Sequence, residues 1–95
     1  MGQGVAMRKN TQQALTAWRN GKSARPAPSI WSNGDALYSY ATPLVMCDDD
    51  RVYLNVTKYS PTTSCHQSAL AAELRDAVRV DNVPRGFSGH LSQCL

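Results

Sequence analysis

The chain has 95 residues, of which 42% are hydrophobic, and a formal net charge of +3. This length fits one domain with a small core, and no apolar run approaches the roughly 20 residues that a membrane-spanning helix needs. The N-terminal residues lack the apolar stretch of a signal peptide, and the three cysteines are too few and too widely spaced for the paired framework of small secreted domains. We therefore expect an intracellular protein with reduced thiols.

Positive charge is concentrated in the first third of the chain. Five cations and no acid precede Asp35; the cations are Arg8, Lys9, Arg19, Lys22 and Arg25. The remainder carries five Lys and Arg against seven Asp and Glu, a formal charge of −2. This split favours electrostatic contact between the N-terminal segment and an acidic or nucleic-acid partner.

The first predicted element is a helix over residues 7–20, with Gly21 at the position of a C-terminal cap. Its apolar face is narrow and consists of Met7, Leu15 and Trp18 with Ala14 or Thr11. Residues 22–29 contain Pro26 and Pro28, which favour a mobile connector. We therefore assign residues 1–29 to a basic N-terminal helix and a proline-containing connector.

An antiparallel sheet of about three strands is predicted next. Asn33-Gly34 is typical of a tight turn after a short strand, and residues 36–47 are extended, with Pro43 indicating a bulge or an edge position. The aspartates at 48–50 predict a solvated turn. Residues 51–59 then alternate, with one apolar face made by Val52, Leu54 and Val56.

A second helix is predicted from Pro61 to Val78, with Pro61 at the first helical position and Ser64 with Gln67 in the spacing of a capping box. Its apolar stripe would cover the face of Val52, Leu54 and Val56, and it consists of Leu70, Leu74, Ala77 and Val78. We thus predict an α+β fold with a sheet-plus-helix core over residues 30–80 and a loosely attached tail over residues 81–95.

The segment Lys58–Gln67, here called the strand-to-helix junction, is the main candidate site. Almost all of its side chains are polar, and the amides of a helix N-terminus attract anions. We therefore predict polar contacts to a partner or an anion from Lys58, Thr62, Thr63, Ser64, His66 and Gln67. The alternative is ordinary helix capping, which uses the same residue types and needs no ligand.

Other chemistries have weaker support. His66 has no identifiable nucleophile to activate and no group to orient it, so we expect no enzymatic activity. Possible metal-binding side chains are scattered, and adjacent Cys65 and His66 would point about 100° apart on a helix, so we expect no metal and no cofactor; those side chains are Cys47, Cys65, His66, His90 and Cys94. Aromatic residues on the predicted strands suit either a stacking surface for single-stranded nucleic acid, formed together with the basic N-terminal segment, or packing between strands; they are Trp31, Tyr38, Tyr40, Tyr53 and Tyr59.

Two motifs carry a resemblance to known proteins. Leu37-Tyr38-Ser39-Tyr40-Ala41-Thr42-Pro43, and Lys-Tyr-Ser-Pro-Thr-Thr-Ser-Cys-His-Gln at residues 58–67, resemble a strand and a strand-to-helix motif of small uncharacterised proteins encoded by bacteriophages and related mobile elements. The resemblance spans about half of the chain. It implies a phage origin, a small α+β fold and a place in the cytoplasm of a bacterial host, and it transfers no catalytic role.

These expectations lead to a functional hypothesis. We predict a phage-type accessory protein that binds, and thereby inhibits, a host protein or nucleoprotein complex, with counter-defence such as anti-CRISPR activity as one example. The alternative is a module that binds nucleic acid directly through its basic N-terminal segment. Neither hypothesis involves a membrane.

Overall fold

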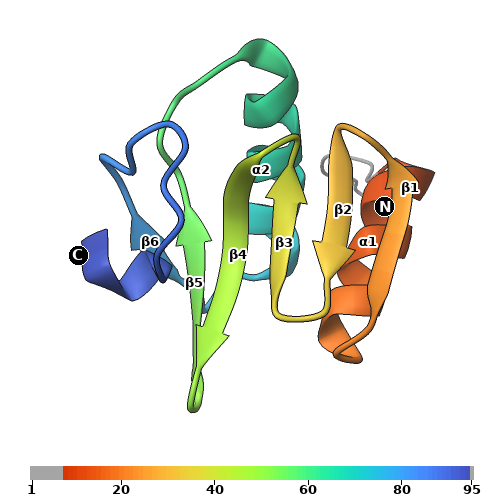
Figure 1. Cartoon of the computed structure of the whole chain (residues 1–95), viewed down its shortest axis with the longest axis horizontal. Coiled ribbons are helices and arrows are strands. Elements are labelled where there is room, and N and C mark those ends of the chain that lie inside the picture. Colours follow the sequence, from red (N-terminus) through yellow and green to blue (C-terminus); the bar gives the residue numbers. More distant parts are fainter. Residues whose placement is uncertain (1–7, 95) are drawn as a thin grey trace.

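A computed structural model describes residues 8–94 of the chain (Figure 1). Its centre is a six-stranded sheet in which the strands lie in chain order, and both helices lie behind that sheet in the view shown. The elements are α1 (Lys9–Arg19), β1 (Ser23–Ala27), β2 (Ile30–Asn33), β3 (Ala36–Ser39), β4 (Thr42–Asp48), β5 (Arg51–Asn55), α2 (Pro61–Glu73), β6 (Val78–Val80) and the 3₁₀ helix η1 (Leu91–Cys94).

The sheet is mixed. Strands β1 to β5 form an antiparallel meander, and β6 pairs parallel to β5 after the chain crosses over through α2. The predicted α+β class with two helices is confirmed, whereas about three strands is fewer than the six observed. Residues 36–47, predicted as one extended segment, are divided by a turn at Tyr40, whose φ is 54°.

The proline-containing connector is part of the sheet, contrary to the prediction. Ser23–Ala27 forms the edge strand β1, and its register with β2 shifts between Ala24 and Ala27. Pro26 lies in this irregular stretch, where its missing N–H removes no regular ladder bond. Pro43 also lies at a register shift, between β3 and β4, so the predicted bulge is confirmed but the edge position is wrong.

Helix α1 ends as the sequence predicts. Gly21 has a φ of 68°, its N–H donates to Trp18 O, and the N–H of Lys22 donates to Ala17 O. These two bonds form a Schellman motif. The predicted apolar face is buried at Thr11, Ala14, Leu15 and Trp18, while Met7 lies outside the described residues.

Helix α2 begins at Pro61, as predicted, but its cap is Ser60 and the helix ends at Glu73. Ser64 therefore lies inside the helix, and the predicted capping box does not form. The predicted extension to Val78 is wrong because Val78 and Val80 pair with β5, where β-branched residues are favoured.

Two cores lie on opposite faces of the sheet. On the helix side, Leu37, Val45 and Leu54 pack with side chains of both helices, and Val52 and Val56 join them, as the alternation of β5 predicts. On the other face, Met46 and Tyr53 pack with Val83 and Leu91. The segment expected to be a loose tail is thus closely packed, because it covers an apolar face that the helices leave open.

The turns follow their residue types. At the β2–β3 turn the side-chain oxygen of Asn33 accepts bonds from the N–H groups of Asp35 and Ala36. Gly34 there has a φ of 98°, and an added Cβ would lie 3.1 Å from Gly21 O, so both conformation and space require glycine. The predicted turn among the aspartates also forms, with Asp49 at a φ of 54°. Within residues 8–94, no helix has the length and apolar character needed to cross a membrane.

Candidate functional site

Most polar side chains of the strand-to-helix junction hold the fold together. The amide nitrogen of Gln67, in α2, donates to Asn55 O and Thr57 O, both at 2.8 Å. Asn55 is fully buried and donates to Pro43 O and to the hydroxyl of Tyr59. These bonds satisfy backbone carbonyls where β5 leaves the sheet, which fixes the position of α2.

The same network reaches the C-terminal segment. The Tyr59 hydroxyl donates to Val83 O at 2.6 Å, and the N–H of Val83 donates to the Thr57 hydroxyl at 2.9 Å. The junction thereby anchors the chain after β6 to the chain after β5. Its polar residues act in place of regular ladder bonds in a stretch without secondary structure.

A chain of hydroxyls ends at His66. Ser60, the cap of α2, accepts from the N–H of Thr63 at 3.3 Å and donates to its hydroxyl at 3.1 Å. The Thr63 hydroxyl lies 3.3 Å from that of Ser39, which in turn lies 3.3 Å from His66 Nδ1. A neutral imidazole that accepts at Nδ1 completes this chain of donors and acceptors.

Burial lowers the pKa of His66, and the nearby positive charge of Arg8 lowers it further. The neutral form is therefore favoured at pH 7, as the hydroxyl chain requires. The imidazole and the Ser39 hydroxyl are both buried, so this pair is closed to a substrate. Among the described residues, every buried side-chain nitrogen and oxygen has a hydrogen-bond partner.

Half of the residues predicted as a contact surface at the junction are therefore buried. Thr63, His66 and Gln67 are buried and point toward the sheet, whereas Lys58 and Thr62 are exposed and Ser64 is half-buried. A sequence signal existed: Thr63, His66, Gln67 and Leu70 recur at intervals of three and four residues, which places them on one face of the helix. Because Leu70 faces the core, the polar residues of that stripe do so too.

The five N-terminal cations are all exposed, but they do not form one cluster. Lys9 and Lys22 lie on the same shallow groove of about 480 Å³ along α1, together with Gln12, Gln13 and Asn20. Arg19 instead extends toward α2, where its guanidinium lies 3.9 Å from Glu73. Arg8 precedes α1, and its positive charge helps to lower the pKa of His66.

Arg25 belongs to an aromatic stack on the sheet face opposite the helices. The rings of Trp31 and Tyr38 are parallel within 9°, with centroids 4.4 Å apart, and the Arg25 guanidinium lies 4.7 Å above the Trp31 ring. We call Arg25, Trp31 and Tyr38 the stack. Its members come from β1, β2 and β3, so only the pairing of these strands brings them together.

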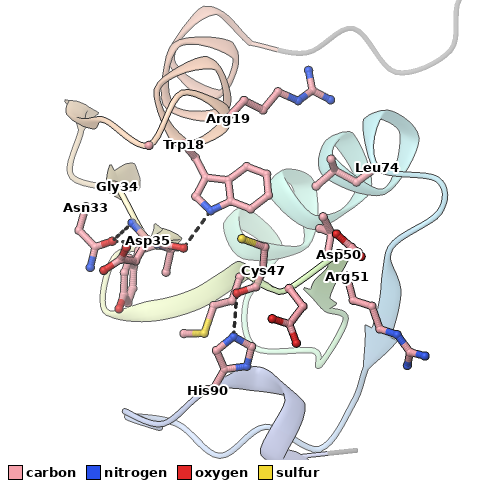
Figure 2. Close-up of a pocket in the computed structure, with 16 residues that line it drawn as sticks. Trp18, Arg19, Asn33, Gly34, Asp35, Cys47, Asp50, Arg51, Leu74 and His90 are labelled. Atoms are coloured by element: carbon pink, nitrogen blue, oxygen red, sulfur yellow. Dashed lines mark hydrogen bonds between the residues drawn. The ribbon is translucent and has the colours of Figure 1, made fainter.

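A cleft of about 860 Å³ lies at the end of the sheet where the β2–β3 and β4–β5 turns project (Figure 2). Trp18 and Leu74 lie on one side of it and His90 on the other. The Trp18 indole donates to Asp35 O at 3.0 Å. Because Ser92 N–H donates to His90 Nδ1, the other ring nitrogen of His90 donates to Cys47 O at 3.1 Å. Nε2 of His90 thus fastens the C-terminal segment to β4, while Nδ1 accepts a bond within that segment.

In the part of the chain that the structure describes, the fold does not gather the possible metal-binding side chains into one site. Within residues 8–94, no three His, Cys, Asp or Glu side chains are grouped closely enough to hold a metal ion, and the three cysteines are free. Tyr53 contacts His90 edge-to-face and belongs to the second core, so it is unavailable as a stacking surface. Tyr59 is half-buried and its hydroxyl is bonded to Val83 O, so the predicted aromatic surface is reduced to Trp31 and Tyr38 of the stack and the exposed Tyr40.

Comparison with known proteins identifies a family. Residues 5–81 match the model of a family of unknown function, DUF8033. No curated protein and no solved structure matches the chain significantly.

Proposed function

Because the match covers most of its length, the chain belongs to the DUF8033 family, and we propose that it is a binding module for a polyanionic partner, namely a nucleic acid or a nucleoprotein complex. The observation that carries this proposal is the exposed basic surface of α1 and β1. Lys9 and Lys22 line the groove along α1, and Arg25 is exposed on the edge strand β1, with no acidic side chain between these positions in the sequence. We call these three residues the basic surface; Lys9 and Lys22 lie on the helix side of the edge strand, and Arg25 lies on the other sheet face.

The basic surface has the shape and chemistry that an extended phosphate chain requires. Lys9 and Lys22 flank α1, whose 11 residues span about 16 Å. Between them the groove exposes amide side chains that donate hydrogen bonds, among them Gln12 and Gln13. Phosphates of a nucleic-acid strand accept such bonds and attract the flanking ammonium groups.

Arg19 adds less to this surface than the sequence suggests. Its partner Glu73 offsets part of its charge, although both side chains are half-exposed and the pair is screened by water. The acidic residues of the β4–β5 turn lie beside the cleft of Figure 2, where Arg51 also lies. That mixed charge disfavours a polyanion there, so the proposal is confined to α1 and β1.

A salt titration with two matched variants tests the proposal. The test variant carries Lys9→Gln, Lys22→Gln and Arg25→Gln, and the control carries Arg75→Gln, Arg79→Gln and Arg85→Gln, all at exposed positions. Each variant loses three positive charges, which takes the formal net charge from +3 to zero. Binding to a labelled single-stranded oligonucleotide is measured by fluorescence polarisation from 50 to 300 mM salt, roughly the range over which such affinities change steeply.

We expect the test variant alone to lose most of its affinity, with the slope of log affinity against log salt falling by about 2 for three lost phosphate contacts. The control variant should keep the slope of the wild type. Equal losses in both variants would show that only net charge matters, and an absence of binding by the wild type at low salt would refute the proposal.

The resemblance to phage proteins supports a more specific role. A phage accessory protein with this surface would bind the exposed nucleic acid of a host nucleoprotein complex and thereby block the complex, as an inhibitor of the anti-CRISPR kind. This role predicts that expression of the protein protects an invading plasmid from interference, and that the variant lacking the basic surface does not. Protection by both the wild type and the variant would show that the inhibition does not depend on the basic surface.

A further inference from the structure

The stack ends in an exposed cation. Since β2 lies between β1 and β3, Arg25 and Tyr38 cover opposite faces of the Trp31 ring. The far side of Tyr38 packs against the second core, whereas Arg25 is exposed on an edge strand. The C-terminal segment lies beside β5 and β6, at the end of the sheet away from β1 and β2 (Figure 1). Among residues 8–94, the stack is thus open at its Arg25 end.

The Trp31 ring is held in place by two contacts, whereas, within the described residues, the Arg25 guanidinium that covers its outer face is held only by the ring itself. Its indole nitrogen donates to Tyr40 O at 2.7 Å, and the parallel Tyr38 ring supports it from within. Arg25, by contrast, makes no salt bridge and no side-chain hydrogen bond within residues 8–94, so its contact with the ring is its main attachment. A planar group that stacks better than a guanidinium can displace it.

We propose that Trp31 is the stacking surface for a base of a single-stranded nucleic acid, which replaces Arg25 on the ring while the Arg25 guanidinium turns to a phosphate of the same strand. This inference rests on the proposed function and adds the class of ligand. It converts one internal contact into two contacts with the ligand, a stacked base and a charge-assisted hydrogen bond.

Charge and geometry identify this occupant. A neutral aromatic ligand would gain nothing from the exposed charge of Arg25 at the open end of the stack. A duplex presents phosphates, but its bases are already stacked and paired, so they cannot reach an upright ring on a sheet face. A single strand supplies a free base and adjacent phosphates together.

An abasic oligonucleotide gives the sharpest test. Its phosphates equal those of an oligothymidylate of the same length, but it has no bases to stack. We expect the wild-type protein to bind the oligothymidylate about tenfold or more tightly than the abasic strand. Trp31→Ala should abolish this preference by weakening binding of the thymidylate strand, and binding of that strand should quench Trp31 fluorescence in the wild type.

Arg25→Ala provides the second variant, because it keeps the ring and removes the cation. It should weaken binding of both strands and retain the preference for the one with bases. If Trp31→Ala fails to fold, Trp31→Phe keeps part of the stacking surface, and an intermediate preference is expected.

The outcomes separate the two proposals. Equal affinity of the wild type for both strands, or a preference that survives Trp31→Ala in the folded protein, overturns the role of Trp31 while the basic surface stands. Failure to bind either strand at low salt overturns the proposed function itself. Preference for a duplex of equal charge would show that phosphates alone are recognised.

Discussion

At the scale of single residues, the strand-to-helix junction shows that a polar sequence does not make a polar surface. Gln67 is a polar residue of a kind often found in contact surfaces, yet both of its donated bonds go to backbone carbonyls within the protein. The sequence contains the helical spacing that turns this residue inward. It does not reveal that β5 ends at Asn55 with carbonyls in need of donors, because that depends on how the chain leaves the sheet.

His66 makes the stability of the protein dependent on pH. Burial lowers its pKa below the usual 6.5, so the unfolded chain binds a proton more readily than the folded protein does. The contribution of neutral His66 to the free energy of unfolding is therefore fully present above about pH 6.5, and it is lost as the pH drops below that value. The urea midpoint, measured at half-unit steps from pH 7.5 to 5, is expected to decrease over the lower part of this range.

Substitution separates this effect from the general acid sensitivity of a small protein. His66→Gln removes the titrating group, so its midpoint should change less with pH than that of the wild type. His90→Gln keeps His66 and should keep the wild-type decrease. A decrease of the same size in His66→Gln would show that other groups are responsible.

At the scale of elements, local signals worked where one residue decides the geometry. Gly21 and Gly34 mark real chain reversals because both adopt a positive φ, and the alternation after Arg51 identifies the buried face of β5. The missed strands lack such signals. Strand β1 contains a proline and no apolar alternation, and β6 has only three residues, so pairing with a neighbour rather than propensity determines them.

The start of α2 gives a direct test of the corrected cap. Ser60→Ala removes the acceptor for the Thr63 N–H and should lower the free energy of unfolding by about 1 kcal/mol. Ser64→Ala, the cap expected from sequence, should change it by less than about 0.5 kcal/mol because Ser64 lies within the helix. Urea denaturation of the two variants measures both values, and a larger loss at Ser64 would contradict the observed helix start.

At the scale of the whole molecule, the fold divides the sheet into a covered end and an open end. The C-terminal segment fills the face over β4 to β6, and the stack occupies the same face near β1. Sequence reasoning combined the basic segment with five aromatic residues as one possible stacking surface, without pairing individual residues. It could not join Arg25 to Trp31, because it treated the connector as mobile and β1 as absent.

The most direct test of the binding surface is a titration of the ¹⁵N-labelled protein with oligothymidylate, followed by NMR. The account predicts that the largest shifts occur at the Trp31 indole N–H and at amides of α1 and β1. Shifts centred on Lys58 and Thr62, or on the cleft beside His90, with the Trp31 signal unchanged, would contradict it.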